Sequence, residues 1–166
     1  MNEPRSNRTP AAPEVYIASS QSAMRVPRKR IGELVAFVAR SENRTVREVD
    51  IAVVDSAHMA ALNRQWRGRR GTTDVLSFDL TDPLDDALAA EIVVCGPVAA
   101  EQAPRHGHGP QRELMLYVVH GLLHLLGYDD DAPDRADVMH AREEELLDRF
   151  LGGPRSGSPT TSPACS

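Results

Sequence analysis

The sequence predicts an α+β fold, in which a small mixed sheet of about four strands packs with helices around one central buried helix. Three observations carry this prediction. Short runs rich in β-branched residues, at 49–54 and 91–95, are typical of buried strands. Apolar residues recur at helical spacing over residues 31–38. Residues 111–126 are apolar on nearly every side, and such a helix belongs in the centre of a domain.

The first half of the chain is expected to form two strands and two helices. Residues 15–17 are a short apolar strand, and the helical spacing over 31–38 indicates the helix that follows it. Residues 49–54 form the second strand. Ser56 is then expected to cap a helix that runs as far as Trp66, whose ring we expect in the core.

The second half of the chain is expected to alternate loops, strands and helices around the central helix. In chain order these are a basic loop at 68–73, a strand at 75–78, a polar loop at 79–89, a strand at 91–95, and helices at 97–104, 111–126 and about 133–151. Gly127 follows the central helix and is expected to end it in a left-handed conformation.

The chain of 166 residues predicts one domain at residues 13–151. Residues 1–12 are polar and residues 152–166 are rich in Gly, Ser and Pro, so both ends are expected to be disordered. No apolar run approaches the roughly 20 residues of a membrane span, and the first residues do not resemble a secretion signal. The two cysteines suggest no disulfide framework. We therefore expect a cytoplasmic protein without a membrane partner.

The net charge of −5 is unevenly distributed along the chain. Residues 1–72 carry a net charge of +6, and residues 73–166 carry −11. Arginine supplies all but one of the 19 basic residues, and its planar guanidinium group suits phosphate because it makes two hydrogen bonds at once. Taken alone, such charge runs are more typical of solvated surface than of RNA binding, and the acidic second half restricts any RNA-binding face to a local patch.

The chemistry of the chain is concentrated at the end of the central helix. His120 and His124 are four residues apart and therefore lie about one turn apart on the same helical face. Two imidazoles in this relation can share one metal ion. Gly127 allows the chain to reverse, so that the acidic residues 129–131 can return toward the histidines. An oxygen ligand from this run would leave a fourth position open for water, as in catalytic metal sites.

Two alternatives bear on this interpretation. Histidines four residues apart also occur by chance, and a histidine on an apolar helix is usually a satisfied core residue. Metal binding is favoured because two histidines in a buried helix are costly without partners. The residue after His120 is Gly121, where zinc proteases of the HExxH type carry their glutamate base. Its absence argues against peptide hydrolysis, and a metal-bound hydroxide would remain that could attack an electrophile or polarise a phosphoryl oxygen.

The run HGLLHLLGYD at residues 120–129 closely resembles the signature of the YbeY family of bacterial endoribonucleases and rRNA maturation factors. Upstream, residues 62–68 and 73–78 are similar to the second conserved block of that family, and residues 91–94 to its acidic-apolar strand. The resemblance extends over roughly residues 48–147. It implies an α+β fold with a metzincin-like site layout, one Zn²⁺ per chain, and single-strand-specific cleavage of RNA.

The resemblance also implies a role in rRNA maturation, notably at the 3′ end of the small-subunit rRNA, and in ribosome quality control. Ribosomal RNA and the ribosome or its proteins are then the expected partners. Two other functions remain open. The chain could be a ribosome-assembly factor whose metal is mainly structural, since no side-chain general base is evident. A metzincin-type metalloprotease is less favoured, because of Gly121 and the absent secretion signal.

In the family three histidines hold the metal, and two of them match His120 and His124. The third position is Asp130 here, because the family's Gly-Tyr-Asp-His is Gly-Tyr-Asp-Asp in this chain. Aspartate is a competent zinc ligand, although an anionic ligand can shift the preference toward harder ions such as Mn²⁺. The neighbouring Asp129 and Asp131 could take this position instead.

The resemblance assigns a catalytic role to Arg67, which matches a family arginine that contacts RNA phosphate near the metal. Positive charge beside a developing phosphorane supports that role. Arg64, Arg69 and Arg70 are expected to bind the substrate through its backbone. The alternative is that all four arginines lie in a solvated helix end and loop. Asp74 is expected to stabilise a turn, or else to orient Arg67 or a ligand histidine through a hydrogen bond. Surface positions are expected for His58, His106, His108 and His140.

Overall fold

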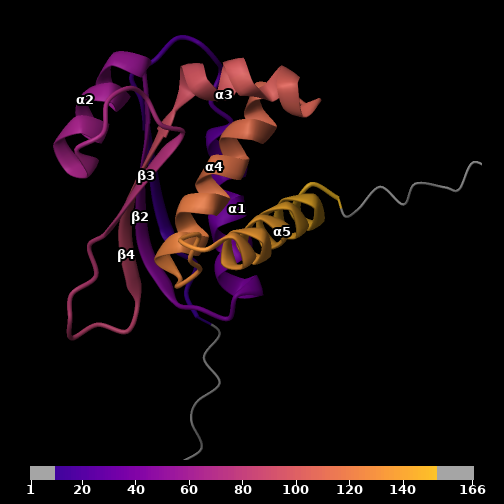
Figure 1. Cartoon of the computed structure of the whole chain (residues 1–166). Helices are drawn as coiled ribbons and strands as arrows, with labels where there is room; N and C mark the ends of the chain where they lie inside the picture. The colour runs from indigo at the N-terminus through magenta and orange to yellow at the C-terminus, as the bar shows by residue number, and fades with distance from the viewer. Residues whose placement is uncertain (1–9, 153–166) are drawn as a thin grey trace, which may run out of the picture.

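The computed structural model describes residues 10–152, which form a four-stranded sheet with helices on both faces (Figure 1). The strand order is β1 (Glu14–Ser19), β2 (Val46–Val54), β4 (Leu88–Cys95) and β3 (Val75–Asp79). The first three run parallel, and β3 lies antiparallel to β4 at one edge. The mixed sheet of four strands confirms the predicted α+β fold.

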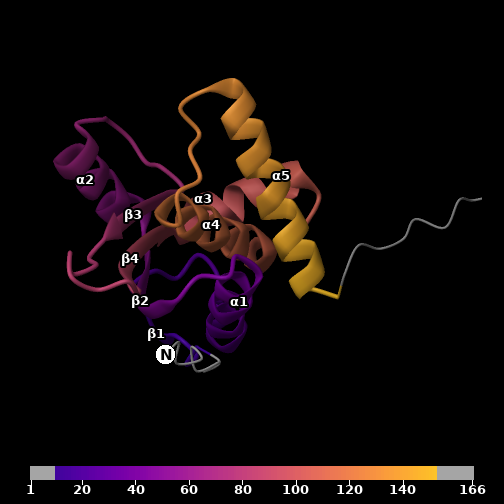
Figure 2. The ribbon, with the colours of Figure 1, turned by 90° about the horizontal axis from the view of Figure 1, so that it is seen from below.

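The main core lies between the sheet and three helices, α1 (Arg28–Ser41), α4 (Pro110–Leu125) and α5 (Pro133–Phe150). Figures 1 and 2 place these helices on the same face of the sheet. Helix α4 is at the centre, since it contacts β3, β4, α1 and α5, and its Leu114, Val118 and Leu122 are completely buried. The prediction that the most apolar helix is the central one is confirmed.

Helix α2 (Ser56–Arg67) packs on the opposite face of the sheet (Figure 2). Its Met59 belongs to a smaller apolar cluster with Val54, Leu76, Val93 and Cys95. The helix is capped by Asp55, whose side chain accepts a hydrogen bond from the backbone N–H of His58 (2.8 Å). The prediction of Ser56 as the cap was therefore wrong by one residue, because a carboxylate immediately before it accepts the bond.

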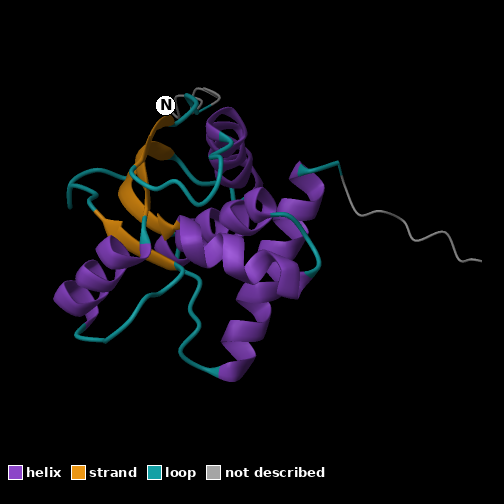
Figure 3. Ribbon diagram, turned by 90° about the horizontal axis from the view of Figure 1, so that it is seen from above, coloured by secondary structure: helices purple, strands orange, loops and turns teal. Residues whose placement is uncertain are grey.

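Two of the predicted boundaries in the second half need correction. The helix predicted at 97–104 is divided into α3 (Gly96–Gln102) and the 3₁₀ helix η1 (Ala103–His106), which lead back to α4. Strand β4 begins at Leu88 rather than at residue 91, because residues 88–90 continue its pairing with β2. Two long loops, 68–74 after α2 and 127–132 before α5, lie on the same side of the molecule (Figures 2 and 3).

The two chain ends predicted to be disordered lie almost wholly outside the described residues, which include only 10–12 of the first segment and Gly152 of the second. Within residues 10–152, no helix combines the length and the apolar character needed to cross a membrane.

Gly121 allows α4 to lie close against the sheet. A Cβ atom at this position would be 3.1 Å from Cγ2 of Val75 and 3.2 Å from Cγ2 of Ile92, which is tighter than ordinary van der Waals contact. Position 121 therefore faces the sheet. A glutamate base of the HExxH type would crowd Val75 and Ile92 at this position, which gives a packing reason for the glycine.

We expect Gly121→Val to lower the free energy of unfolding by about 1–3 kcal/mol, since the added methyl groups force Val75 and Ile92 out of place. Gly32→Val is the matched control, because a Cβ at this helical position of α1 meets nothing within 4 Å. Urea denaturation of both variants measures the difference. Equal stabilities of the two variants would show that α4 does not depend on close approach at Gly121.

Candidate metal centre

One stripe of α4 is polar, although the rest of the helix is buried in apolar surroundings. Glu113, Tyr117, His120 and His124 follow one another at spacings of four, three and four residues, which places them on one helical face. An open hollow of about 650 Å³ lies over the first three of them. Its other walls are the end of loop 68–74, helices α3 and η1, and the middle of α5.

The lining of this hollow is acidic. Among the described residues that line it are four carboxylates and three imidazoles, but no lysine or arginine. The carboxylates are those of Asp74, Glu101, Glu113 and Glu143, and the imidazoles those of His106, His120 and His140. Imidazole nitrogens and carboxylate oxygens are the donors that divalent transition metals prefer, so the donor set of the hollow fits such an ion.

His120 is held in one orientation by Glu143 of α5. Nδ1 of the imidazole is hydrogen-bonded to Oε1 of Glu143, whose side chain is buried. The hydrogen bond to Glu143 raises the pKa of His120, against the opposing effect of burial. Because Glu143 engages Nδ1, Nε2 of His120 is directed toward the turn after α4, where it lies 3.8 Å from Oδ2 of Asp130. A carboxylate behind a histidine in this way fixes the ring of many metal ligands.

The acidic turn after α4 presents three carboxylates in different situations. Gly127 reverses the chain with a φ of 107°, as predicted. Both oxygens of Asp129 are engaged, one by the backbone N–H of Asp131 (2.8 Å) and the other by Arg135 (2.7 Å). The pKa of Asp129 is lowered, mainly by the hydrogen bond from the Asp131 N–H and to a smaller extent by the charge of Arg135. Asp130 is exposed and directs one oxygen toward His120, so it is the freer candidate ligand.

The structure brings His120 and Asp130 together, and His124 is exposed one turn further along α4. The helix is buried as predicted, but His120 is only half-buried and His124 is exposed, because the polar stripe of α4 faces the open side. The described residues contain two groups of at least three potential ligands with donor atoms within 4.8 Å of one another. They are His106, His108 and Glu113, and the run of Asp129, Asp130 and Asp131.

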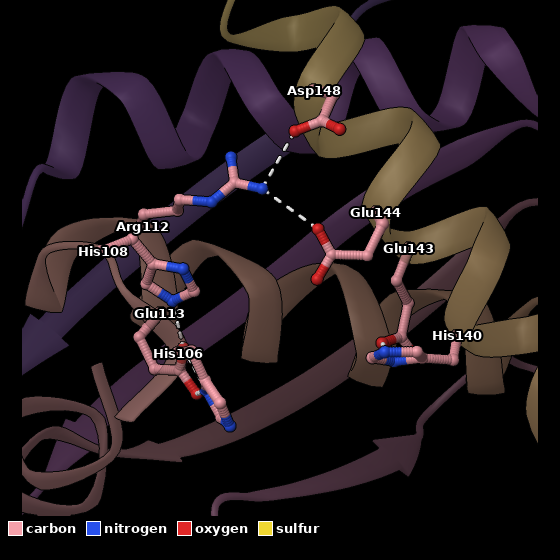
Figure 4. A network of polar contacts seen from close by, with 8 residues as sticks. All are labelled: His106, His108, Arg112, Glu113, His140, Glu143, Glu144 and Asp148. Atoms are coloured by element: carbon pink, nitrogen blue, oxygen red, sulfur yellow. Dashed lines mark hydrogen bonds and ion pairs between the residues drawn. The ribbon is translucent and has the colours of Figure 1, made fainter. Parts of the chain in front are cut away.

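The group of His106, His108 and Glu113 joins η1 to the first turn of α4 (Figure 4). Nδ1 of His106 lies 3.0 Å from both oxygens of Glu113, and Nε2 of His108 is hydrogen-bonded to Oε2. Burial alone would raise the pKa of Glu113, but the hydrogen bonds from both histidines and Tyr117 outweigh it and lower the pKa. The same residue types bind transition metals. His106 is exposed, as predicted, whereas His108 is partly buried, and both pair with Glu113, which the sequence did not suggest.

Arg112 fixes α5 against α4 and thereby positions Glu143. Its guanidinium group donates hydrogen bonds to Glu144 (3.0 Å) and to Asp148 (2.9 Å), both on α5 (Figure 4). Because Glu143 precedes Glu144 directly, this contact fixes where along α4 the Glu143 carboxylate meets the polar stripe. Helix α5 is thus part of the site.

The four predicted RNA-binding arginines lie apart from the hollow. Arg64 and Arg67 are in the last turn of α2, and Arg69 and Arg70 follow in loop 68–74. All four are exposed, and none forms a salt bridge with a carboxylate of residues 10–152. The hollow is reached instead by Thr72, Thr73 and Asp74 at the end of the same loop. The structure shows no direct contact between Arg67 and His120.

Glu113 and Glu143 were not predicted as site residues, although the sequence contains a signal for each. Glu143 stands one turn after Met139 and one turn before Leu147, so a charged residue occupies the buried face of an amphipathic helix. Glu113 begins the one polar stripe of the central helix. A charge on the apolar face of a predicted helix indicates a buried partner, which for Glu143 is His120.

The chain is similar to known endoribonucleases over most of its length. A sequence profile described as Endoribonuclease YbeY matches residues 16–151. A protein named Endoribonuclease YbeY from Renibacterium salmoninarum is 36% identical over 143 residues, which cover 81% of this chain and 91% of the relative. One of the same name from Carboxydothermus hydrogenoformans is 42% identical over 99 residues, covering 60% and 69%.

The fold is similar to a solution structure of a Thermotoga maritima protein. The superposition has a TM-score of 0.58 at 26% sequence identity and covers 92% of this chain and 99% of the other.

We expect Glu113→Gln to lower the free energy of unfolding at neutral pH by about 1–3 kcal/mol, since it removes a buried charge from two imidazole donors. The folded-state pKa of Glu113 is lowered, so its contribution is present above the unfolded pKa and is lost as the pH falls through the folded value. Urea denaturation against pH measures both effects. The exposed Glu101→Gln should change little, and an equal loss in both variants would contradict the prediction.

Proposed function

The chain belongs to the YbeY endoribonuclease family and is a nuclease, and we propose that it uses a divalent ion at the end of α4 to cleave single-stranded ribosomal RNA. We place this activity in the maturation of rRNA, notably at the 3′ end of the small-subunit RNA, and in ribosome quality control. The cytoplasm is then its location, and the ribosome or ribosomal proteins are its partners.

One observation carries the metal-dependent part of the proposal. The buried Glu143 fixes His120 so that its Nε2 faces Asp130 at 3.8 Å, at the end of a helix that also carries His124. His120, His124 and Asp130 would hold the ion, and a site of three protein ligands keeps one position open. When bound, a divalent ion supplies Lewis-acid polarisation of a phosphoryl oxygen and lowers the pKa of water.

The remaining steps depend on the residues of the chain itself. Glu143 keeps the His120 ring in one tautomer and orientation, and Asp130 contributes negative charge that favours retention of a cation. Arg67 is proposed to stabilise negative charge on the phosphate, which requires that the RNA strand reach from the hollow to the end of α2. Because Asp130 replaces a neutral histidine, Mn²⁺ is a plausible alternative to Zn²⁺.

A second candidate function is ribosome assembly with a mainly structural metal. The observation in its favour is that all four carboxylates that line the hollow already have a partner: Val75 N–H for Asp74, Arg105 for Glu101, the two histidines for Glu113, and His120 for Glu143. No dedicated general base is therefore apparent there. Peptide hydrolysis is disfavoured because Gly121 stands where HExxH proteases carry their glutamate base, and a larger side chain there would crowd Val75 and Ile92.

The first test combines elemental analysis with cleavage of a labelled single-stranded fragment from the 3′ end of small-subunit rRNA. We expect about one ion per wild-type chain, and loss of both ion and cleavage in His124→Ala and Asp130→Ala. Arg67→Ala should retain the ion and cleave roughly 10²-fold more slowly. His106→Ala is the matched control, since it removes an imidazole from the hollow outside the proposed ligand set.

Each contrary result identifies a different error. Loss of the ion in His106→Ala but not in His124→Ala would move the metal to the group around Glu113. Full occupancy in Asp130→Ala would exclude this residue as a ligand. Stoichiometric metal without cleavage, or cleavage that persists in His124→Ala, would favour the assembly factor.

We expect Glu143→Gln to weaken metal binding by roughly 10–100-fold, because the amide no longer holds the His120 ring as a charged acceptor does. Competition with a chromogenic zinc chelator measures the affinity directly and does not depend on activity. Glu145→Gln is the control, as this side chain is exposed on the same helix and pairs with Arg142. If both variants bind zinc as tightly as the wild type, Glu143 does not position a ligand.

A further inference from the structure

Trp66 was expected in the core, but 60% of its surface is exposed. It lies in the last turn of α2, and its ring meets that of Phe78 on the edge strand β3. The ring centroids are 5.5 Å apart and the planes are inclined by 68°, an edge-to-face contact. Phe78 therefore supports one edge of the indole while much of the indole stays open to solvent.

The two rings border a second hollow, of about 710 Å³, on the face of the sheet opposite α4. Its apolar lining includes Leu62 of α2 and Ala52 and Val93 of the sheet. Two carboxylates, those of Asp79 and Glu91, lie on the side of the strands. A flat aromatic group fits the apolar part, whereas a phosphate is repelled by the carboxylates.

The surroundings of Trp66 on the helix side have the opposite charge. Residues 56–73 contain four arginines and no acidic residue. Arg64, Arg67, Arg69 and Arg70 are all exposed, and no side-chain hydrogen bond or ion pair to another described residue holds any of them. Exposed guanidinium groups without carboxylate partners, on the same helix end and loop as an exposed indole, are typical of surfaces that bind single-stranded nucleic acid.

We propose that Trp66, supported by Phe78, is a stacking platform for one base of single-stranded RNA, and that the neighbouring arginines bind the adjacent phosphates. This inference rests on the proposed RNA substrate and names a binding site for it outside the metal centre. Base stacking tolerates any sequence, because every base has a π face. The platform therefore selects unpaired RNA, since a base in a duplex has no free face.

Loop 68–74 connects this platform to the metal centre. It begins directly after the last turn of α2 with Arg69 and Arg70, and its end at Thr72, Thr73 and Asp74 lines the hollow beside His120. A strand stacked at Trp66 can follow the basic part of this loop around the edge strand β3. The carboxylates of Asp79 and Glu91 oppose the alternative course across the open sheet.

Trp66 is the single tryptophan of the chain, so its fluorescence reports on this position alone. We would titrate the full-length His124→Ala variant, in EDTA to prevent cleavage, with a single-stranded RNA decamer. A decamer of the same backbone without bases is the control, and fluorescence anisotropy of a dye on each oligonucleotide reports binding independently. The RNA should quench Trp66, whereas the abasic strand should bind more weakly and leave the fluorescence unchanged.

Substitutions then measure the contribution of the ring to affinity. In the same His124→Ala background, Trp66→Ala should weaken RNA binding roughly 5- to 100-fold, the range for loss of one base–aromatic stack, while abasic binding stays unchanged. Trp66→Phe should restore part of the loss. Tyr16→Ala is the matched control, because Tyr16 is 56% exposed on the far edge strand and lies outside both the hollow and the basic segment.

The outcomes separate this inference from the proposed function. RNA that binds by anisotropy without quenching Trp66, or equal losses in Trp66→Ala and Tyr16→Ala, would overturn the platform and leave the nuclease intact. Equal quenching by the abasic strand would also overturn it, because phosphate contact alone would then explain the signal. Absence of any RNA binding, together with absence of cleavage by the wild type, would overturn both.

Discussion

The contact between Glu143 and His120 is the constraint on which the site depends, because it joins α5 to the polar stripe of α4. A buried carboxylate is costly unless a hydrogen-bonding partner compensates it. Here the partner is a histidine whose other nitrogen faces Asp130. The fold therefore places α5 where Glu143 is satisfied, and the same placement orients the imidazole. The packing of α5 and the proposed metal site therefore depend on the same contact.

A buried glutamate that is compensated by histidine occurs at two places along α4. Glu113 is buried at the start of the helix and is compensated by His106 and His108, as Glu143 is by His120 further along. Both pairs open into one hollow, which is why a helix otherwise surrounded by apolar residues can carry polar groups on one face. Removing either carboxylate would leave imidazoles without their acceptor, so these positions tolerate little change.

Local patterns predicted what depends on local structure. The apolar periodicity of 111–126 identified the central helix, and the spacing of His120 and His124 located the candidate site, because both follow from helix geometry. Partners far apart in sequence were not predictable, since pairing Glu143 with His120 requires the angle between two helices. The prediction for Trp66 was wrong for a related reason. It lies one turn after Leu62 on the sheet-facing side of α2, but the sheet meets it only at its edge, through Phe78 of β3, so much of the ring stays exposed.

The distribution of charge separates the proposed RNA-binding surface from the proposed metal site. The hollow beside His120 contains carboxylates and no arginine among its described residues, so without a cation it repels phosphate. The arginines stand instead on α2 and loop 68–74, where no neighbouring carboxylate neutralises them. Had they lined the hollow, they would have paired with Glu113 and Glu143 and released the histidines. Separating the two charges along one loop keeps the ligands free for a cation and the guanidinium groups free for phosphate.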